Sequence, residues 1–546
     1  MSLIEFHKVA KAFGGDPVIE GATFALPHRA KVGLVGENGS GKSTILRLMA
    51  GEVEPDTGSV HVARSARLWH VPQVAQLEPG RTAFEEVLAA RPRLFARRER
   101  MHRLEHTLDQ AATSEASAEY AQCVADFSEL GGYAFEREAH EALRALGIGD
   151  AQHGLSVERL SGGEQSRVAL AKALLADSTA LLLDESDNHL DIDGIEWLER
   201  TLQRHRGALV LVTHDRELLD RVVDSVLEIE DGTVTWQRGS YAGFLERKRD
   251  RLERQKQQYL EQQRRVRRLN EAMTRVDGVA RGIDAGTAND HLRRVGKMVA
   301  RKSKILKRRI QRELDNTHRI EKPREQRKRI QLALDARKRH ARTVLRIEGA
   351  AKAFGERRLF ADASLELARG ERIALIGPNG TGKTTLMEIA LGRQKPDAGT
   401  VWRSPGANAF YCDQLHAGID DALSVYDTIA RHTDLSRNQI HYLLARLLFP
   451  AEALDTRVGH LSGGERTRLV LALLMNTRAD LLLLDEPTTH LDLPGTEVLE
   501  EALTRFAGAV LFISHDRRLV RAAATRVVEL RDGTLTRRLK GSDLES

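Results

Sequence analysis

Short apolar runs and one long, sparse apolar stripe divide this chain of 546 residues into regions of different character. Runs of four or five apolar residues bounded by polar ones indicate buried strands. Four such runs occur as two matching pairs: ALLLDE (180–185) with LLLLDE (481–486), and LVLVTHD (209–215) with VLFISHD (510–516). The pattern predicts an α/β fold that is present twice.

The stretch between the two copies has the pattern of long surface helices. Apolar residues that recur every seven places give a charged helix one narrow apolar stripe, and here the stripe consists of Leu245, Leu252, Tyr259, Val266 and Met273. The first helix is predicted to end near Asp277, and the nearly uncharged segment 278–289 to form a loop. Helical spacing then resumes with Val299, Leu306, Ile310 and Leu314, until Pro323 ends or bends the element. We therefore expect a helical hairpin whose arms of about 30 residues reach about 45 Å.

The spacing of repeated motifs defines the domain organisation. Three pairs are 341 residues apart (Phe13 and Phe354, Lys42 and Lys383, Gln73 and Gln414), and three are 301 apart (Ser161 and Ser462, Asp184 and Asp485, His214 and His515). The first copy therefore carries 40 extra residues between Gln73 and Ser161. The predicted domains are 1–245, with a helical insertion at about 81–141, the linker 246–340, and 341–546.

Charge is distributed unevenly along the chain. Residues 246–340 contain 31 Lys and Arg against 13 Asp and Glu, a balance of +18, whereas the net charge of the whole chain is +6. The two flanking domains together therefore carry a net charge of −12, and the basic linker predicts a polyanionic partner such as nucleic acid. The alternative is a helix face that is merely solvated.

Cysteine content and hydropathy exclude several classes of protein. Only two cysteines, Cys123 and Cys412, are present, which leaves neither a disulfide framework nor a paired-cysteine zinc site. No apolar run reaches the ~18 residues that span a bilayer, and MSLIEFHKVA has no signal-peptide pattern. These features favour a cytoplasmic protein that does not enter a membrane.

Each copy contains a phosphate-binding loop, GENGSGKST (36–44) and GPNGTGKTT (377–385). Glycines allow backbone amides to approach phosphate oxygens, the lysine neutralises the terminal phosphates, and the hydroxyl after it binds Mg²⁺. In the first loop we assign ATP binding to Gly36, Asn38, Gly39, Gly41, Lys42, Ser43 and Thr44. In the second loop the corresponding residues are Gly377, Asn379, Gly380, Gly382, Lys383, Thr384 and Thr385.

The strand-end acids complete a site for ATP hydrolysis. Asp184 and Asp485 are placed to hold Mg²⁺ together with Ser43 and Thr384, and Glu185 and Glu486 to orient and deprotonate the attacking water. His214 and His515, each after a short apolar run, are predicted to contact the terminal phosphate.

LSGGEQ (160–165) and LSGGER (461–466), between the phosphate loop and the acid pair, resemble the signature of ATP-binding-cassette ATPases. The resemblance implies that Gln73 and Gln414 contact Mg²⁺ and that Phe13 and Phe354 stack on adenine. It also implies head-to-tail closure, in which Ser161 and Gly163 share an ATP with Lys383, while Ser462 and Gly464 share one with Lys42.

The first copy departs from the family pattern after its acid pair. It reads SDNHLD, whereas the second reads PTTHLD, so Ser186 replaces the usual proline and Asp187 adds a carboxylate next to Glu185. A like charge nearby is expected to raise the pKa of Glu185, and the two sites are then expected to differ in rate.

Two complete cassettes joined by a basic hairpin resemble the ABC-F subfamily of ATP-binding-cassette ATPases. That resemblance implies a monomer with paired cassettes that binds the 70S ribosome near the tRNA exit site, with its linker near the peptidyl-transferase centre and the P-site tRNA. The 40-residue excess resembles the subfamily's arm, and RPRLFARRERMHRL (91–104) fits a ribosomal contact as well as it fits an ordinary helical extension. The predicted RNA-binding residues are Arg293, Arg294, Lys297, Arg301 and Lys302.

Other functions remain as alternatives. A transporter's dual-cassette ATPase subunit would require a separate permease. Excision-repair ATPases resemble the chain poorly, because they rely on cysteine-rich zinc modules. Chromosome-maintenance ATPases split one cassette around a far longer coiled coil, whereas both cassettes are complete in this sequence. Within the ABC-F reading, the role is either translation control or antibiotic resistance, and the tip 278–290 identifies no drug.

Overall fold

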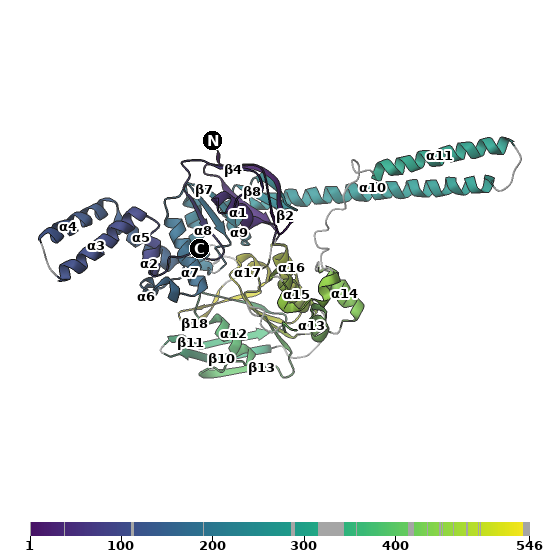
Figure 1. The fold of residues 1–546 in the computed structure, drawn as a ribbon. Coiled ribbons are helices and arrows are strands. Elements are labelled where there is room, and N and C mark those ends of the chain that lie inside the picture. The colour runs from purple at the N-terminus through teal and green to yellow at the C-terminus, as the bar shows by residue number, and fades with distance from the viewer. Residues whose placement is uncertain are drawn as a thin grey trace. The chain divides into compact units, whose positions relative to one another are not determined.

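The computed structural model describes most of both cassettes and of the hairpin between them (Figure 1). The chain divides into two compact units: one contains both cassettes, and the other is the segment 242–329. The predicted domain boundaries near residues 245 and 340 stay predictions. The described residues are 2–37, 39–110, 114–188, 190–284, 290–314, 343–355, 357–412, 420–433, 435–446, 449, 451–461, 463–476, 479–489, 491 and 493–538.

The first cassette has two sheets with an apolar core between them. A three-stranded antiparallel sheet has the order β2 (Asp16–Pro27), β1 (Ser2–Phe13), β4 (Thr57–Val62). A six-stranded sheet has the order β5 (Leu68–Val71), β6 (Ala180–Asp184), β7 (Ala208–Val212), β3 (Lys31–Gly36), β8 (Ser225–Glu230), β9 (Thr233–Arg238), and only β9 is antiparallel. One core cluster joins Phe6 of β1, Leu34 of β3 and Ile45 of α1 (Lys42–Ala50). Because every residue of β6 and β7 is buried, the apolar runs predicted as buried strands are confirmed.

Helices complete the first cassette. After β6 and β7 come α8 (Ile192–Arg204) and α9 (Arg216–Val222), and α7 (Gly162–Leu175) begins in the signature motif. The segment before α7 contains α2 (Ala83–Leu88), α3 (Pro92–Gln110), α4 (Ser114–Glu129), α5 (Gly132–Ala145), α6 (Asp150–His153) and the 3₁₀ turn η1 (Val157–Arg159).

The second cassette repeats this architecture. Its small sheet has the order β11 (Arg357–Ala368), β10 (Thr343–Phe354), β13 (Ala398–Arg403), and its large sheet has the order β14 (Ala409–Cys412), β15 (Leu481–Asp485), β16 (Ala509–Ile513), β12 (Arg372–Ile376), β17 (Arg526–Arg531), β18 (Thr534–Arg538). Its helices are α12 (Lys383–Leu391), α13 (Val425–His432), α14 (Arg437–Arg446), α15 (Gly463–Asn476), α16 (Leu493–Arg505) and α17 (Arg517–Ala523), with 3₁₀ turns η2 (Ala451–Asp455) and η3 (Val458–His460).

The length difference between the cassettes falls on α3 and α4. Counting back 301 residues from α14 leads into α5, whereas counting back 341 from α13 leads into α2, so the extra residues lie between α2 and α5. We call α3 and α4, residues 92–129, the arm. Its two helices pack around Leu94, Met101, Cys123 and Phe127.

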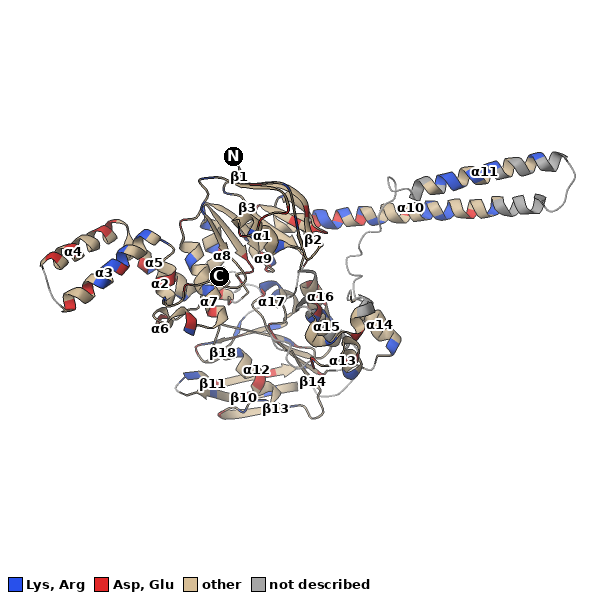
Figure 2. Cartoon of the chain, viewed as in Figure 1, with Lys and Arg blue, Asp and Glu red and all other residues tan. Residues whose placement is uncertain are grey.

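Most charged pairs of the arm lie within it or at its base. Arg97 is 3.1 Å from Asp126 of α4, Arg98 is 2.9 Å from Glu136 of α5, and Arg100 pairs with Glu119. Figure 2 shows basic positions on α3 and acidic positions on α4. Since these arginines are paired, the described arm carries less unpaired positive charge than the sequence 91–104 suggests.

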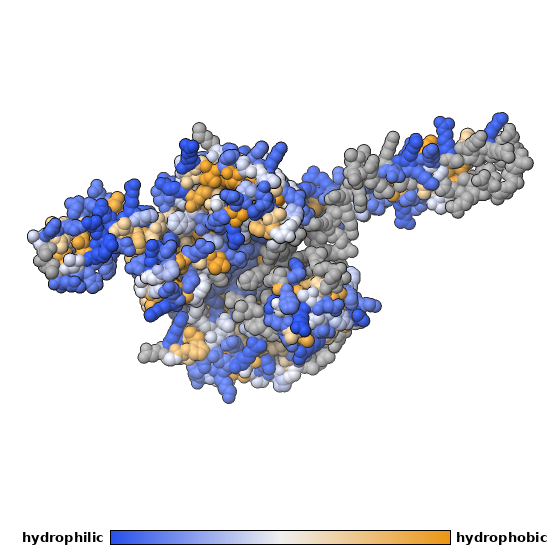
Figure 3. All heavy atoms as spheres, viewed as in Figure 1, coloured by the Kyte–Doolittle hydropathy of each residue, from blue (hydrophilic) through white to orange (hydrophobic). Residues whose placement is uncertain are grey.

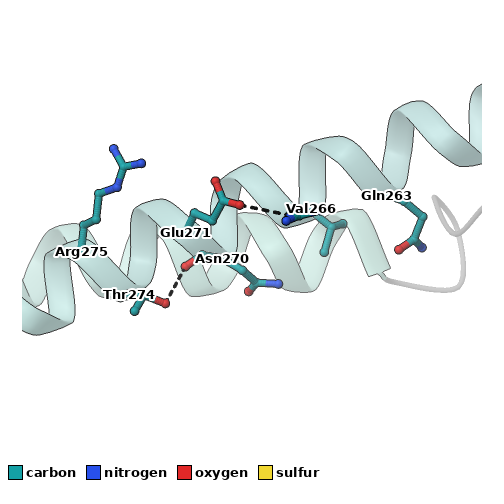
Figure 4. A pocket seen from close by; sticks show the side chains of 7 residues that line it. Gln263, Val266, Asn270, Glu271, Thr274 and Arg275 are labelled. Carbon is teal, nitrogen blue, oxygen red and sulfur yellow. Dashed lines mark hydrogen bonds and ion pairs between the residues drawn. The ribbon is translucent and has the colours of Figure 1, made fainter.

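The linker unit is a pair of helices, α10 (Tyr241–Asp284) and α11 (Asp290–Leu314), which run side by side (Figures 1 and 4). Leu252, Tyr259, Val266 and Met273 are buried or half-buried while their charged neighbours are exposed, so the predicted stripe is confirmed. The predicted end of the first helix near Asp277 is wrong. The helix runs to Asp284, because a glycine weakens a helix by only about 1 kcal/mol and Gly278 and Gly282 do not stop it.

A buried arginine joins the two cassettes. The guanidinium of Arg517 on α17 is 1% exposed and lies 3.0 Å from Glu199, 3.7 Å from Asp215 and 3.6 Å from Glu217, which all belong to the first cassette. Arg216, at the equivalent position of the first cassette, lies 2.9 Å from Glu497 of α16. The start of α9 and the start of α17 therefore each supply a cation to carboxylates of the opposite cassette.

We expect Arg517→Ala to lower the free energy of unfolding by about 3–5 kcal/mol, since it leaves three carboxylates without their buried cation. Urea denaturation followed by circular dichroism measures the change. The control is Arg518→Ala, whose half-exposed side chain lies 3.5 Å from Glu500 and should contribute at most about 1 kcal/mol. Equal effects of the two substitutions would contradict the assigned role of Arg517.

Candidate nucleotide sites

Both phosphate-binding loops connect a central strand to a helix, at the edge where the parallel strands end. The first runs from β3 into α1 and the second from β12 into α12. The Nζ of Lys42 donates to the carbonyl oxygens of Gly36 (3.0 Å) and Glu37 (3.1 Å), and the Nζ of Lys383 donates to those of Gly377 (2.7 Å) and Pro378 (2.9 Å). Each ammonium thus lies inside its own loop, where the helix N-terminus also favours an anion.

The glycines of the loops are required by close backbone packing. Gly377 has φ 140°, and a Cβ at this position would lie 2.2 Å from the carbonyl oxygen of Leu530 on β17. A Cβ on Gly36 would lie 2.8 Å from the carbonyl oxygen of Ile229 on β8. Left-handed φ angles occur at Gly39, Gly41, Gly380 and Gly382.

The remaining predicted loop residues lie on or next to the helices. Ser43 and Thr44 are in the first turn of α1, and Thr384 and Thr385 are in the first turn of α12. Asn379 lies between β12 and α12, and Asn38 is outside the described residues.

The acid pair of the first cassette lies at the end of β6, against the loop. Asp184 accepts a hydrogen bond from the Ser43 hydroxyl, and burial raises the pKa of Asp184. Glu185 accepts from His214 Nε2 (3.1 Å), Asn188 Nδ2 (3.1 Å) and Gln73 Nε2 (3.3 Å). The structure therefore brings together the side chains predicted as magnesium ligand, base, phosphate contact and magnesium-contacting glutamine.

The expected effect of Asp187 on Glu185 is wrong. Burial alone would raise the pKa of Glu185, but the hydrogen bond and charge of His214, with Lys42 and Asn188, lower it below its usual value. Asp187 instead accepts a hydrogen bond from the Thr213 hydroxyl, and its own burial raises the pKa of Asp187 to about 6. Because Asp187 points to the residue before His214, it adds no dominant negative charge to Glu185.

The acid pair of the second cassette has fewer polar contacts to its glutamate among the residues described. Glu486 accepts from the backbone amide of His515 (3.3 Å), and His515 Nε2 is 3.2 Å from Glu486 Oε1. Burial raises the pKa of Glu486 to about 7 and lowers the pKa of His515 to about 4. Asp485 ends β15, as Asp184 ends β6, whereas Gln414 is outside the described residues.

Both glutamates adopt a left-handed backbone that the sequence did not suggest. Glu185 has φ 50° and Glu486 has φ 48°. This conformation is uncommon for a residue other than glycine, and it persists only where the surroundings enforce it. The type of a residue does not predict its backbone angle. The one sequence signal for this conformation is that both glutamates occupy the same position after a buried strand.

The aromatic residues predicted for adenine are half-exposed and each lies beneath a lysine. Phe13 is 50% exposed and Phe354 is 52% exposed. Lys11 Nζ lies 5.6 Å from the Phe13 ring centre, and Lys352 Nζ lies 5.6 Å from that of Phe354. Sequence reasoning missed these lysines, although they share the 341-residue offset of the aromatic pair.

The signature serine of the first cassette caps a helix. Ser161 is the N-cap of α7 and its hydroxyl accepts from the amide of Glu164, while Gly163 lies in the first turn. Gly464 lies in the first turn of α15, and Ser462 is outside the described residues. A direct contact joins the cassettes near the second loop, because the amide of Asn379 donates to Asp191 Oδ2 (3.1 Å).

Comparisons with known proteins agree with this geometry. The family model described as ABC transporter matches residues 19–188 and 360–489, and a second model with the same description matches 227–332. ABC transporter F family member 5 of Arabidopsis thaliana is 32% identical over 97% of this chain and 75% of its own. This chain belongs to the ABC-F subfamily of ATP-binding-cassette ATPases. As an ABC-F protein it binds and hydrolyses ATP.

Other ABC-F relatives are similar over nearly their whole length. The tylosin resistance ATP-binding protein of Streptomyces fradiae is 35% identical over 98% of each chain. The energy-dependent translational throttle protein of Mycobacterium tuberculosis is 32% identical over 95% of this chain and 90% of its own. The solved structure of RNase-L inhibitor has a TM-score of 0.58 at 19% identity, covering 97% of this chain and 90% of that chain. The predicted fold, two tandem cassettes with a long helical linker, is confirmed.

We expect Gly377→Ala to abolish ATP binding at the second loop, because its Cβ cannot fit against the backbone of Leu530. Equilibrium binding of a fluorescent ATP analogue should fall from two sites per chain to one. Gly355→Ala is the control, since its φ of 59° is also positive but its Cβ would meet no atom within 4 Å. Two remaining sites in Gly377→Ala would contradict the expectation.

Proposed function

We propose that this ABC-F ATPase binds the 70S ribosome near the tRNA exit site when ATP closes its cassettes, and acts on the peptidyl-transferase region through its linker. The observation that carries the proposal is the charge of α11, which has ten Lys and Arg against two Asp and Glu. Ribosomal RNA and tRNA present phosphates that such a helix can grip without reading bases.

The exposure of α11 supports contact with RNA. Arg294, Arg301 and Lys302 are exposed on α11, and hydrophilic side chains cover most of the described part of the hairpin in view (Figure 3). Arg293 and Lys297 lie on the same helix, and their side chains are outside the described part. These five residues are proposed to contact rRNA and, near the tip, the P-site tRNA.

At the ATP sites we propose the following chemistry. Mg²⁺ fits the oxygen-rich sets of Ser43, Gln73 and Asp184 in the first cassette and Thr384, Gln414 and Asp485 in the second, because Mg²⁺ prefers hydroxyl, carbonyl and carboxylate oxygens. Bound Mg²⁺ would neutralise charge that develops on the phosphates. Glu185 and Glu486 orient the attacking water, and His214 and His515 hold each glutamate in place from within hydrogen-bonding distance.

Closure would complete each site with the opposite signature. The Ser161 hydroxyl and the amides at the start of α7 are proposed to meet the ATP held by Lys383, and Ser462 with Gly464 the ATP held by Lys42. The contact from Asp191 to the amide of Asn379 supports this pairing, since it already brings the first cassette against the second loop.

Two roles fit this activity: translation control, and antibiotic resistance by ribosome protection. One relative is named for tylosin resistance and another for throttling translation. In either role the chain acts in the cytoplasm as a monomer with paired cassettes. The alternative is the ATPase subunit of a transporter, which would have to use a separate permease, since no helix within the described part of the chain is long and apolar enough to cross a membrane.

We expect the double variant Glu185→Gln, Glu486→Gln to cosediment with 70S ribosomes in the presence of ATP, since it binds nucleotide and closes but does not hydrolyse it. Wild-type protein with ADP is the control and should remain in the supernatant. If the double variant also remains unbound with ATP, the ribosomal proposal fails. Recovery with membranes instead would favour the transporter subunit.

Changing Arg293, Arg294 and Lys297 to Glu should weaken ribosome binding about tenfold or more and flatten its salt dependence, because phosphate contacts release counterions. ATP binding should be unchanged. The control changes Arg358, Lys395 and Arg537 to Glu, which alters the net charge equally at exposed positions of the second cassette. If both triple variants lose affinity to the same degree, general charge rather than the hairpin determines binding.

A further inference from the structure

The side chain of Gln152 is fixed at both ends of its amide. Gln152 lies on α6, the short helix that connects α5 to the signature motif. Its Oε1 accepts from the amide of Gly149 (2.9 Å), and its Nε2 donates to Glu164 Oε1 (2.5 Å). With one end on the backbone and the other on a carboxylate, the side chain has little freedom to reorient.

Glu164 in turn holds the signature serine. Its second oxygen, Oε2, accepts from the backbone amide of Ser161 (2.8 Å) and from the Ser161 hydroxyl (2.8 Å). Burial opposes ionisation of Glu164, but the hydrogen bonds from Ser161 and Gln152 and the charge of Arg167 lower its pKa, so the carboxylate is charged and accepts from both residues. Glu164 therefore holds Ser161 with one carboxylate oxygen and Gln152 with the other.

The same segment is connected to the base of the arm. His153, the residue after Gln152, lies with its Nδ1 2.7 Å from Nδ1 of His140 on α5, and its Nε2 lies 3.1 Å from the Ile148 carbonyl oxygen. The His140 ring stacks on Phe84 of α2 with ring centres 4.3 Å apart. The residue next to Gln152 thus contacts α5 directly and α2 through the His140 ring, and the arm is inserted between these two helices.

At the equivalent positions the second cassette lacks both the glutamine and the histidine of this connection. The 301-residue offset that relates Ser161 to Ser462 relates Gln152 to Ala453 and His153 to Leu454. Neither side chain has a polar atom to donate to the signature. Among the described residues, a glutamine that connects to the signature in this way therefore occurs in the cassette that carries the arm.

We propose that Gln152 is a positioning residue for ATP hydrolysis: through Glu164 it sets the Ser161 hydroxyl and ties one of the two ATP sites, the one that Ser161 completes, to the base of the arm. The inference rests on the proposed pairing of Ser161 with Lys383. Its consequence is that loss of Gln152 slows hydrolysis at the site of Lys383 and Glu486 and spares the site of Lys42 and Glu185.

The test introduces Gln152→Ala into two background variants. Alanine is the residue at the equivalent position of the second cassette, Ala453. Glu185→Gln leaves hydrolysis to Glu486, and Glu486→Gln leaves it to Glu185. A rapid-quench measurement with protein in excess over ATP records the first hydrolysis, so a slow reopening of the cassettes does not affect it. We expect a three- to tenfold slower first hydrolysis in the Glu185→Gln background, with unchanged ATP affinity, and no change in the Glu486→Gln background.

Two further variants, Gln122→Ala and Ser161→Ala, distinguish the possible outcomes. Gln122→Ala removes another glutamine that donates to a carboxylate, Asp126 on α4 (2.8 Å), and should change neither rate. Ser161→Ala reports the pairing itself: if it slows the Glu486→Gln background instead, the proposed pairing is wrong. If Ser161→Ala slows only the Glu185→Gln background and Gln152→Ala does not, the role of Gln152 is wrong while the pairing stands. Equal slowing by Gln152→Ala in both backgrounds, or a lower unfolding temperature that accounts for the slowing, would also overturn the proposal.

Discussion

The structure depends on the burial of opposite charges at one edge of each large sheet. A lysine from the phosphate loop and two acids from the neighbouring strand end lie there, in a region where an isolated ion would be costly. Lys42 contributes to lowering the pKa of Glu185, and Lys383 opposes the burial that raises the pKa of Glu486. The cost of burying each charged group is offset by the opposite charges beside it. This mutual compensation requires the strand ends and the loop to keep fixed relative positions. The rest of the cassette, from the glycine contacts under β8 and β17 to the apolar core, holds these groups in place.

The two sites solve this problem differently although they derive from the same pattern. Among the described residues, Glu185 accepts from three side chains, His214, Asn188 and Gln73. Glu486 accepts from a backbone amide and lies 3.2 Å from His515 Nε2, and its pKa is raised to about 7. A base that is already ionised can accept the proton of water directly. A base whose pKa is near physiological pH must first lose its own proton before water attacks. The divergence in sequence after the acid pairs thus has a counterpart in electrostatics, although not the one expected from Asp187.

Features that repeat in the sequence were predicted well, because a pattern that recurs at a constant offset rarely arises by chance. The strand ends at Asp184 and Asp485, the loop glycines and the heptad stripe follow from residue type and spacing alone. The end of α10 was missed, since a glycine weakens a helix without necessarily ending it. The ion pairs of the arm's arginines could not be predicted from the sequence, because their acidic partners lie on other helices, α4 and α5. Backbone angles such as those of Glu185 and Glu486 leave no trace in composition.

The seam of the hairpin is not wholly apolar. Gln262 of α10 and Ser303 of α11 are 6% and 7% exposed, among the apolar residues of the stripe. Burying an amide or a hydroxyl is costly unless it meets a hydrogen-bond partner, and both residues have partners. A buried polar residue restricts the register in which two helices pair, because any other register would have to bury it among different neighbours. Gln262 and Ser303 thus favour one register of the hairpin over the others, although both are embedded in a mostly apolar stripe.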